Sequence, residues 1–326
     1  MLLFNQRLIQ QHYGMKEAIA DVRATLRAKK NGQIDAPERT VVNVAEYNAS
    51  ALYMPCLNLA SQMAAMKVVS IFPTNAEKNL PTTQGAMLLT NMENGQHIAL
   101  MNASYLTRLR TGAQSAIATE RFAKKDADTL AVIGTGGMAF EQVLGINEVR
   151  QLTTIYLYNR TKDKAFTFKQ KLADFGVTAE IIVVDSAAEA AKHAQIINCA
   201  TRSTESVILK SEVQPGTHIN GVGSYLPEMR EIDTALITAD NQIIVDDVEG
   251  FTHEAGEFIA AVNDGTWAFD QIFASLEDVV TDETIVRRDD EVITIFKSVG
   301  ASYYDLAVAE GTYREVKPYG ETITIE

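Results

Sequence analysis

The N-terminal part of the chain changes from a helical spacing of apolar residues to spacings typical of strands. Five apolar positions fall on one helix face, and Gly32 suits the end of that helix. These positions are Met15, Ala18, Ile19, Val22 and Leu26. Strand-like stretches follow at residues 40–47, 51–57, 64–72, 85–92 and 96–101. The last two flank Glu93-Asn94-Gly95, a typical hairpin turn, so a helical hairpin and an antiparallel sheet are predicted, with another helix over residues 104–123.

After residue 129 the pattern becomes an alternation of short apolar runs and helical runs. The candidate strands are residues 130–133, 153–158, 180–184, 195–200, 217–222 and 242–245. Ser186 and Glu189 form a capping box for one helix between them. Such alternation predicts a parallel, doubly wound sheet of the Rossmann type. Residues 291–310 are predicted to be a last helix, which returns the chain to the first domain.

The two patterns predict an α/β protein with two domains, because 326 residues exceed what one core usually holds. The predicted Rossmann-type dinucleotide-binding domain covers residues 116–304. A smaller α+β domain combines residues 1–115 with 305–326. Apolar residues make up 46% of the chain, enough to fill both cores.

Composition excludes several classes of partner. The net charge of −13 disfavours nucleic acid and anionic lipid, although local cations can still bind a small anion. No apolar run is long enough to span a membrane, and the N-terminus lacks the order of a signal peptide. Cys56, Cys199 and five scattered histidines show no metal-ligand spacing. We expect a cytoplasmic protein without a metal, with its histidines, including His218, at the surface or in loops.

A glycine motif, G-x-G-x-x-A, directly follows the first apolar run of the second part. Gly134 permits a tight turn, Gly136 lets a pyrophosphate approach backbone N–H groups, and Ala139 lets the next helix lie on the sheet. A helix-compatible run, residues 138–149, follows. The motif in this context indicates a dinucleotide site rather than an ordinary Gly-rich turn.

The turn after the second strand indicates which dinucleotide binds. An NAD site has an acidic residue about 20 residues past the glycines, which bonds the ribose 2′-hydroxyl. Here the turn is Asn159-Arg160-Thr161 and contains no carboxylate. Arg160 can pair with a 2′-phosphate, so NADP(H) is favoured and NAD(H) stays possible. Alternatively, the turn only caps the following helix, with Thr161 at the N-cap.

Three isolated cations of the first domain are candidates for binding an anionic substrate. Lys67 lies in an otherwise apolar stretch, Arg39 opens a strand, and Arg110 lies in the helix that leads to the nucleotide domain. If they converge, they form a carboxylate clamp, which we expect at the carboxyl ends of the parallel strands, facing the first domain. From residue types alone, each is equally a surface cation or an ion-pair partner.

Seven segments, in order, resemble the ornithine cyclodeaminase/mu-crystallin family over nearly the whole chain. They are Pro-Glu-Arg at 37–39, Met-Lys-Val at 66–68, Leu-Pro-Thr at 80–82, Leu-Arg-Thr-Gly-Ala-Gln-Ser-Ala at 109–116, Val-Ile-Gly-Thr-Gly at 132–136, Ile-Asn-Gly-Val-Gly-Ser at 219–224 and Ile-Phe-Lys-Ser-Val-Gly at 295–300. The Arg-Thr-Gly-Ala helix ahead of the glycine motif is specific to this family among Rossmann proteins.

The resemblance implies a homodimer whose first domain forms the dimer contact and the substrate floor. It implies that Arg39, Lys67 and Arg110 hold the substrate carboxylate. Thr82 then lies near the nicotinamide, and residues 298–300 touch its ring. The predicted nucleotide contacts are Gly134, Gly136, Gly137, Met138, Asn159, Arg160, Thr161, Thr111, Ala200, Thr201, Val222, Gly223, Ser298 and Gly300.

Two departures separate the chain from the cyclodeaminases of this family. Tyr225 takes the position of an Asp that binds the substrate amine, and a neutral phenol cannot replace an anion at pH 7. The turn at residues 159–161 is similar to that of NADPH-using ketimine reductases. We therefore predict an NAD(P)H-dependent reductase of a small cyclic ketimine acid, such as pyrroline-2-carboxylate. Its catalytic candidates are Lys67, Arg110, Thr82 and Tyr225. The proton donor is either Tyr225 or a water near Thr82, and Tyr225 is alternatively a lid that only packs on the substrate.

Two other functions stay open at this point. One is a cyclodeaminase that converts ornithine to proline and ammonia, or a related amino-acid dehydrogenase such as alanine dehydrogenase. The other is a non-catalytic NADP(H)-binding or ligand-binding protein of the mu-crystallin type, because a fold does not fix a function.

Overall fold

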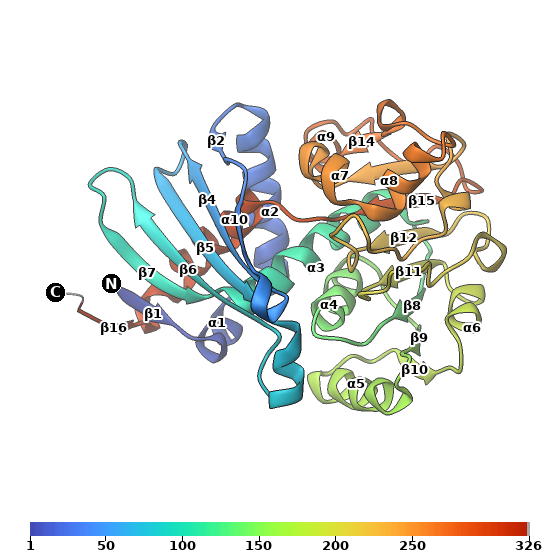
Figure 1. The fold of residues 1–326 in the computed structure, drawn as a ribbon, viewed down its shortest axis with the longest axis horizontal. Coiled ribbons are helices and arrows are strands. Elements are labelled where there is room, and N and C mark those ends of the chain that lie inside the picture. Colours follow the sequence, from blue (N-terminus) through green and yellow to red (C-terminus); the bar gives the residue numbers. More distant parts are fainter. Residues whose placement is uncertain (325–326) are drawn as a thin grey trace. The chain divides into compact units, whose positions relative to one another are not determined.

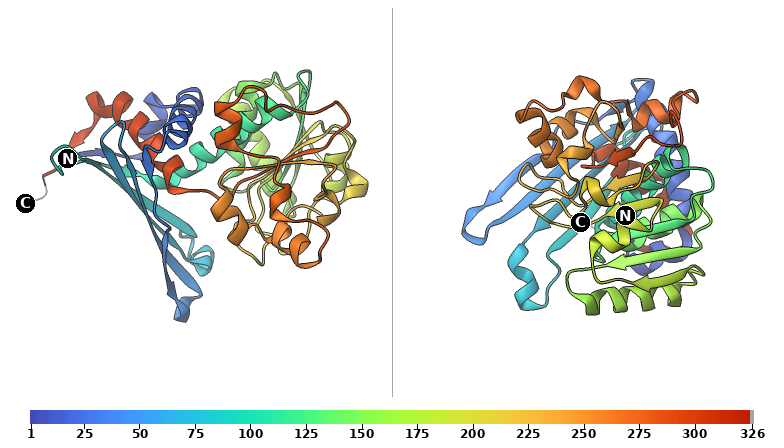
Figure 2. Two further views of the ribbon diagram at one scale, coloured as in Figure 1. Left: turned by 90° about the horizontal axis from the view of Figure 1, so that it is seen from above. Right: turned by 90° about the vertical axis from the view of Figure 1, so that its right-hand side faces the viewer.

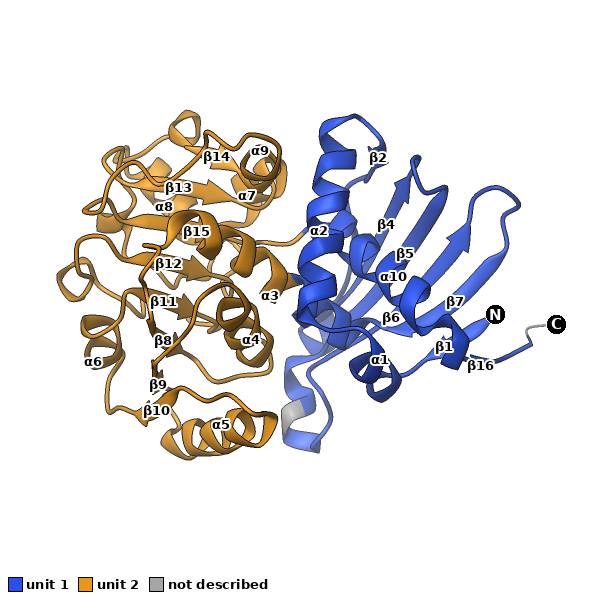
Figure 3. Ribbon diagram, turned by 180° about the vertical axis from the view of Figure 1, so that it is seen from behind, with its two compact units in different colours: residues 1–110, 301–326 blue, residues 111–300 orange. Residues whose placement is uncertain are grey.

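The computed structural model describes residues 1–324, apart from the side chain of Ala76, and its contacts divide it into two compact units (Figures 1 and 3). Unit 1 comprises Met1–Arg110 and Ala301–Glu326, and unit 2 comprises Thr111–Gly300. Unit 1 is thus assembled from both ends of the chain. The domain boundaries predicted from the sequence were residues 115/116 and 304/305.

Unit 1 is built on an eight-stranded sheet whose path is β16-β1-β7-β6-β5-β4-β2, with β3 paired to β4. Its strands are β1 (Leu2–Phe4), β2 (Ile34–Asp35), β3 (Thr40–Val44), β4 (Ala49–Asn58), β5 (Met63–Ile71), β6 (Thr83–Asn91), β7 (His97–Asn102) and β16 (Glu321–Thr322). The pairs from β3 to β7 are antiparallel, as predicted. The parallel pair of β1 with β7 was not predicted.

Helices cover one face of this sheet (Figure 2). They are α1 (Gln6–His12), α2 (Met15–Lys30) and α10 (Ser302–Val316). The apolar stripe predicted for α2 is confirmed, because all five of its residues are buried. Along β4 and β5 alternate residues point to opposite faces, so Met54 and Lys67 are buried while Tyr53, Met66 and Val68 are exposed.

Unit 2 contains the predicted parallel sheet, with strand order β10-β9-β8-β11-β12-β15-β13-β14. Its strands are β8 (Thr129–Ile133), β9 (Thr154–Tyr158), β10 (Glu180–Val183), β11 (Ile196–Cys199), β12 (His218–Gly221), β13 (Gln242–Val245), β14 (Ala274–Ser275) and β15 (Thr294–Lys297). The first five positions follow the 3-2-1-4-5 order of a doubly wound fold. Both faces are buried: Leu130 and Val132 of β8 belong to one hydrophobic core, and Ala131 and Ile133 to another.

Helices connect these strands. They are α4 (Ala139–Val149), α5 (Lys162–Phe175), α6 (Ala187–Lys192), α7 (Val248–Glu254), α8 (Gly256–Asn263) and α9 (Leu276–Thr281), preceded by α3 (Ala103–Phe122), which begins in unit 1. The capping box predicted before α6 forms only in part. Ser186 accepts from the backbone N–H of Glu189, but the Glu189 carboxylate accepts from Asp185 instead.

Two expectations were wrong. Residues 291–310 are not one helix: β15 occupies their first part, and α10 begins only at Ser302. Thr294, Ile295 and Phe296 are fully buried between β12 and β13, and a strand buried on both faces has no polar alternation. His218 is not a surface residue but lies in β12, where burial lowers its pKa to about 3.

Candidate active site

The loop between β8 and α4 is a tight turn that stays open beside its middle glycines. Gly134 has a φ of +91°, and a Cβ there would lie 2.7 Å from Thr201 Cγ2, so only glycine fits. A Cβ at Gly136 or Gly137 would meet nothing within 4 Å. Ala139 is fully buried at the start of α4. The loop therefore has the shape that the glycine motif predicts.

Thr135, in the same loop, has a buried hydroxyl that lacks a hydrogen-bond partner among the described residues. Its backbone N–H donates to Asn159 Oδ1 over 3.1 Å. A buried polar atom without a partner needs an explanation, and a phosphate oxygen would supply the missing acceptor. Together with the open surface at Gly136 and Gly137, this hydroxyl fits a dinucleotide pyrophosphate.

The turn after β9 is fastened to the glycine loop by Asn159. The Asn159 amide accepts from Thr135 and donates to the backbone oxygen of Thr161 over 2.9 Å. Thr161 stands at the N-cap of α5, but its side chain makes no capping hydrogen bond, so the side-chain cap considered above does not form. Arg160 and Thr161 are exposed. The turn thus offers a guanidinium at the surface, without a carboxylate beside it.

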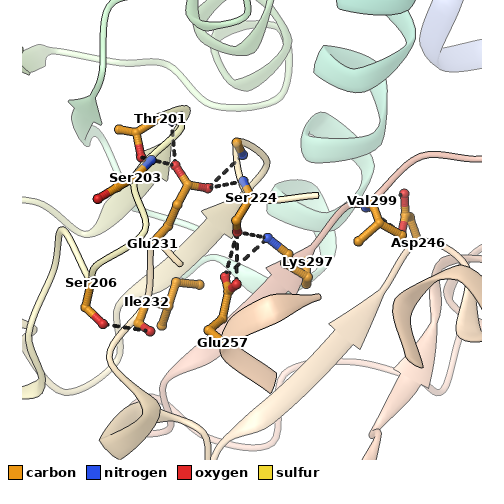
Figure 4. Close-up of polar contacts among 11 residues, drawn as sticks. Thr201, Ser203, Ser206, Ser224, Glu231, Ile232, Asp246, Glu257, Lys297 and Val299 are labelled. Carbon is orange, nitrogen blue, oxygen red and sulfur yellow. Dashed lines mark hydrogen bonds and ion pairs between the residues drawn. The ribbon is translucent and has the colours of Figure 1, made fainter. Parts of the chain in front are cut away.

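A buried carboxylate, Glu231, joins the loops that follow β11 and β12 (Figure 4). Its Oε1 accepts from the Thr201 backbone N–H at 2.5 Å and from the Thr201 hydroxyl at 2.9 Å. Its Oε2 accepts from the backbone N–H groups of Gly223 at 2.7 Å and Ser224 at 3.1 Å. Burial raises the pKa of Glu231, and the Lys297 charge and these donors oppose that rise. A Cβ at Gly223 would lie 2.1 Å from the Thr201 carbonyl, so the two loops touch.

A second buried carboxylate, Asp246, fixes the loop after β15. Its Oδ2 accepts from Ser298 Oγ at 2.8 Å and from the Gly300 backbone N–H at 2.7 Å. Val299 N–H donates to it at 3.1 Å, and the Gln114 amide of α3 at 3.2 Å. Asp246 directly follows β13, so this loop is held at the carboxyl end of the sheet, where ligands of such folds bind.

The remaining predicted nucleotide contacts lie near these loops. Ala200 follows β11, where its backbone N–H donates to Ile133 of β8 over 2.9 Å. Val222 follows β12 and donates to Cys199 over 3.0 Å. Thr111 is buried in α3, and Met138 stands at the N-cap of α4. All the predicted nucleotide contacts thus belong to unit 2.

In unit 1, three charged side chains meet in a buried cluster. Lys67 is 3% exposed, Arg110 6% and Asp305 1%. Lys67 Nζ donates to Asp305 Oδ2, and Arg110 Nε lies 3.3 Å from Asp305 Oδ1. Thr107 Oγ1 is 3.5 Å from the same oxygen. The structure therefore brings Lys67 and Arg110 together through a carboxylate, on the helix-covered face of the sheet.

Arg39 completes this charge distribution. It is half-buried and directly precedes β3, where Thr40 pairs with Tyr53, the neighbour of the Met54–Lys67 pair. Burial lowers the pKa of Lys67 to about 8; the Asp305 charge opposes this, and the Arg110 and Arg39 charges add to it. Arg39 and Arg110 thus both add positive charge around Lys67.

The two other catalytic candidates lie in different units. Thr82 is a half-buried residue of unit 1 just before β6, and its backbone oxygen accepts from Phe72 over 2.8 Å. Tyr225 is a half-buried residue of unit 2 in the loop after β12, next to Ser224. Residues 1–324 contain no group of three or more His, Cys, Asp or Glu side chains that could hold a metal ion. No helix in that range could cross a membrane.

Four residues that organise these sites were not predicted from the sequence: Thr135, Glu231, Asp246 and Asp305. For two of them a signal existed. Asp305 interrupts the apolar run Tyr-Tyr-Asp-Leu-Ala-Val-Ala at 303–309, the same criterion that identified Lys67. Asp246 directly follows the apolar run at 242–245. Glu231 lies among mixed residues, and nothing local distinguishes it.

Comparison with known proteins gives a consistent result. The model of the ornithine cyclodeaminase/mu-crystallin family matches residues 2–318. A Delta(1)-pyrroline-2-carboxylate reductase from Bacillus cereus is 34% identical, and the alignment covers 100% of both chains. The structure of the Thermococcus litoralis Delta(1)-pyrroline-2-carboxylate reductase, in complex with NADH and L-proline, is 32% identical with a TM-score of 0.95, covering 99% of this chain and 100% of that one. An archaeal alanine dehydrogenase dimer with bound NAD is 29% identical with a TM-score of 0.91, covering 100% and 99%.

Proposed function

Because the chain belongs to the ornithine cyclodeaminase/mu-crystallin family, we propose that it is an NAD(P)H-dependent reductase of a small cyclic ketimine acid, such as pyrroline-2-carboxylate, which it converts to proline. The observation that carries this proposal is the buried cluster of Lys67, Arg110 and Asp305. Full-length similarity to pyrroline-2-carboxylate reductases supports the same assignment.

The cations of unit 1 bind the substrate carboxylate in this proposal. Lys67 has a pKa of about 8, so it is mostly charged at pH 7 and attracts an anion. Arg110 and Arg39 add the positive charge of two guanidinium groups. A carboxylate held by several cations is fixed in orientation as well as in position, and such orientation supplies much of the rate in a transfer reaction.

Unit 2 holds the nicotinamide cofactor in this proposal. Thr135 and the backbone at Gly136 and Gly137 receive the pyrophosphate. The loops fixed by Glu231 and Asp246 supply the remaining contacts. The bound cofactor supplies the hydride that reduces the C=N bond.

The imine nitrogen also needs a proton, and Tyr225 is our candidate for the donor. Its phenol O–H can donate a hydrogen bond. A ketimine lacks the free ammonium group of an amino acid, so its recognition does not require an anion at this position. A tyrosine at this position, in place of an acidic residue, therefore favours the reductase over an enzyme that binds ornithine.

Two assays test the function. Purified protein with pyrroline-2-carboxylate and NADPH is expected to consume NADPH, followed by its absorbance, and to form one proline per NADPH. The same protein with ornithine and NAD is expected to release no ammonia. Stoichiometric ammonia release without net NADH formation would instead identify a cyclodeaminase.

We propose that the cofactor is NADPH in preference to NADH, because Arg160 is exposed in a turn that lacks a carboxylate. The structures of two relatives described above contain NADH and NAD, so the proposed preference for NADPH rests on this turn of the present chain. Arg160→Asp should reverse the preference by about two orders of magnitude in kcat/KM, since it removes a charge-assisted pair and adds repulsion. The ratio of kcat/KM for NADPH and NADH measures this. Lys192→Asp, at an exposed lysine in the last turn of α6, serves as the control, and an unchanged ratio in Arg160→Asp would contradict the assignment.

We propose that the protein is a homodimer joined through the open face of the unit 1 sheet. Neighbouring positions on β4 and β5, namely Tyr53, Met66 and Val68, are exposed there, and a contiguous exposed apolar patch marks an interaction surface. The related archaeal alanine dehydrogenase is a dimer.

Introducing a charge on this face should dissociate the dimer. Val68→Asp is expected to halve the mass measured by light scattering at micromolar concentration, because an unpaired charge would be buried in the interface. Phe166→Asp is the matched control, since Phe166 is a similarly exposed apolar residue on α5 of unit 2. A wild-type monomer, or a Val68→Asp dimer, would contradict the proposed interface.

A further inference from the structure

Unit 2 contains a fully buried ion pair that the function proposed above does not yet use. Lys297 Nζ lies 3.2 Å from Glu257 Oε1, and both side chains have no exposed surface. Ser224 joins the pair: its hydroxyl donates to the Glu257 carboxylate, at 3.0 and 2.9 Å from the two oxygens, and accepts from Lys297 Nζ. Figure 4 shows the three side chains pointing toward one another from α8, β15 and the loop after β12.

Stability alone does not account for this group. Removing two charges from water is costly, and well-packed apolar residues of similar size are often at least as stable. The surrounding strands are apolar: Ile295 and Phe296 precede Lys297 on β15. A fully buried lysine and glutamate that both reach one hydroxyl therefore require a reason beyond packing.

Ser224 is held from two sides. Glu231 accepts from its backbone N–H at 3.1 Å, and the Lys297–Glu257 pair binds its side chain. Gly223, the residue before it, is held by Glu231 as well. The residue after it is Tyr225, whose side chain is half-buried. The position of the Tyr225 backbone is thus determined by bonds to its immediate neighbour.

Lys297 also connects this loop to the next one. It ends β15 and directly precedes Ser298, and its backbone oxygen accepts from the Asp246 N–H over 3.1 Å. In the sheet it pairs with Gly221 of β12, the strand that leads into the Ser224 loop. Lys297 therefore links the Ser224 loop, through its side chain, to the start of the loop at residues 298–300, through its backbone.

We propose that Lys297 is a positioning residue: together with Glu257 it fixes Ser224, and through Ser224 it holds Tyr225 where the phenol serves the substrate imine. This inference rests on the proposed reductase function. It assigns the buried pair a role in turnover rather than in cofactor binding, because its contact with the reaction runs through Tyr225.

Three variants test the inference. Ser224→Ala removes the hydroxyl and leaves the ion pair in place. Lys297→Met with Glu257→Leu replaces both charges of the pair by apolar side chains, so that Glu257 is not left buried without its partner if Lys297→Met alone fails to fold. Thr294→Val is the matched control in the same strand: its buried hydroxyl bonds His218 at 2.8 Å at the opposite end of β15.

The expected result is a lower kcat with little change in binding. Ser224→Ala and the double variant should lower kcat about tenfold, with KM and the Kd for NADPH within about twofold of wild type. Thr294→Val should lower Tm but keep kcat within about twofold, as a merely structural contact does. In a Tyr225→Phe background the effect of Ser224→Ala on kcat should fall to less than about twofold, because the two changes then disrupt one interaction.

Other results overturn the inference. A wild-type kcat in folded Ser224→Ala and in the double variant would reduce the pair to a structural role. An undiminished effect in the Tyr225→Phe background would show that the pair acts on something other than Tyr225. A wild-type protein that reduces no ketimine acid would overturn the proposed function too, and this result differs from the others because it needs no variant.

Discussion

Lys67→Met is expected to lower kcat/KM for a cyclic ketimine acid by about 100- to 1,000-fold. A loss of 100- to 1,000-fold corresponds to about 3–4 kcal/mol, which lies within the cost of about 2–5 kcal/mol for truncating one partner of a buried, hydrogen-bonded pair of charges. KM should rise and kcat should fall together, since the carboxylate is both bound and oriented by this cluster. Steady-state kinetics at pH 7, with NADPH saturating, gives both constants.

Two controls separate this effect from misfolding. The Kd for NADPH should stay within about twofold of wild type, because the proposed cofactor contacts belong to unit 2 while Lys67 belongs to unit 1. Lys78→Met removes an exposed lysine of the same unit and should leave kcat/KM unchanged. A Lys67→Met enzyme with wild-type KM would remove Lys67 from the substrate site.

The main features of the fold could be predicted because the pattern of apolar residues along the strands differs between the two sheets. Strands of unit 1 have one buried and one open face, so β4 and β5 alternate between buried and exposed side chains. The doubly wound sheet was predicted from its alternation with helices. The same reasoning failed at β15, because a strand covered on both faces resembles part of a buried helix.

The cations of the candidate site were predicted from the sequence, but the carboxylates that hold the site together were not. A lysine in an apolar stretch is conspicuous, so Lys67 was found from its neighbours. Its partner Asp305 is 238 residues away along the chain, and local spacing contains no record of that pairing. The chain has 42 acidic residues, and only the fold shows that Glu231 and Asp246 are buried beneath loops.

These buried carboxylates share one arrangement. Glu231 holds Thr201 and Gly223, Asp246 holds Ser298 and Gly300, and Asp305 holds Lys67 and Arg110. In each case the residues that the sequence predicted as ligand contacts are held by an acidic residue that it did not predict. Sequence motifs therefore identified the residues proposed to contact ligands, while the pairing of these residues with their carboxylates became visible only in three dimensions.

In Asp305→Asn, the decline of kcat/KM at alkaline pH is expected to begin at a lower pH than in the wild type. With a pKa of about 8, Lys67 is charged below that pH and loses its proton above it, so kcat/KM should fall as pH rises through about 8. The Asp305 charge raises the pKa of Lys67, whereas Arg110 and Arg39 lower it. Removing the Asp305 charge leaves only the cations, so the decline in kcat/KM should move to lower pH. For each pH unit by which the decline moves, kcat/KM at alkaline pH should be about tenfold lower.

The pH profile of kcat/KM reports groups of the free enzyme, so the position of the decline is independent of how much protein is folded. Lys67→Arg provides the decisive comparison, because a guanidinium stays charged throughout the range. In Lys67→Arg and in Lys67→Arg/Asp305→Asn the decline near pH 8 should disappear, whatever the absolute activity. If Asp305→Asn keeps the wild-type profile, or if the decline survives in Lys67→Arg, then Lys67 does not set it, and the cluster acts on the substrate through its arginines alone.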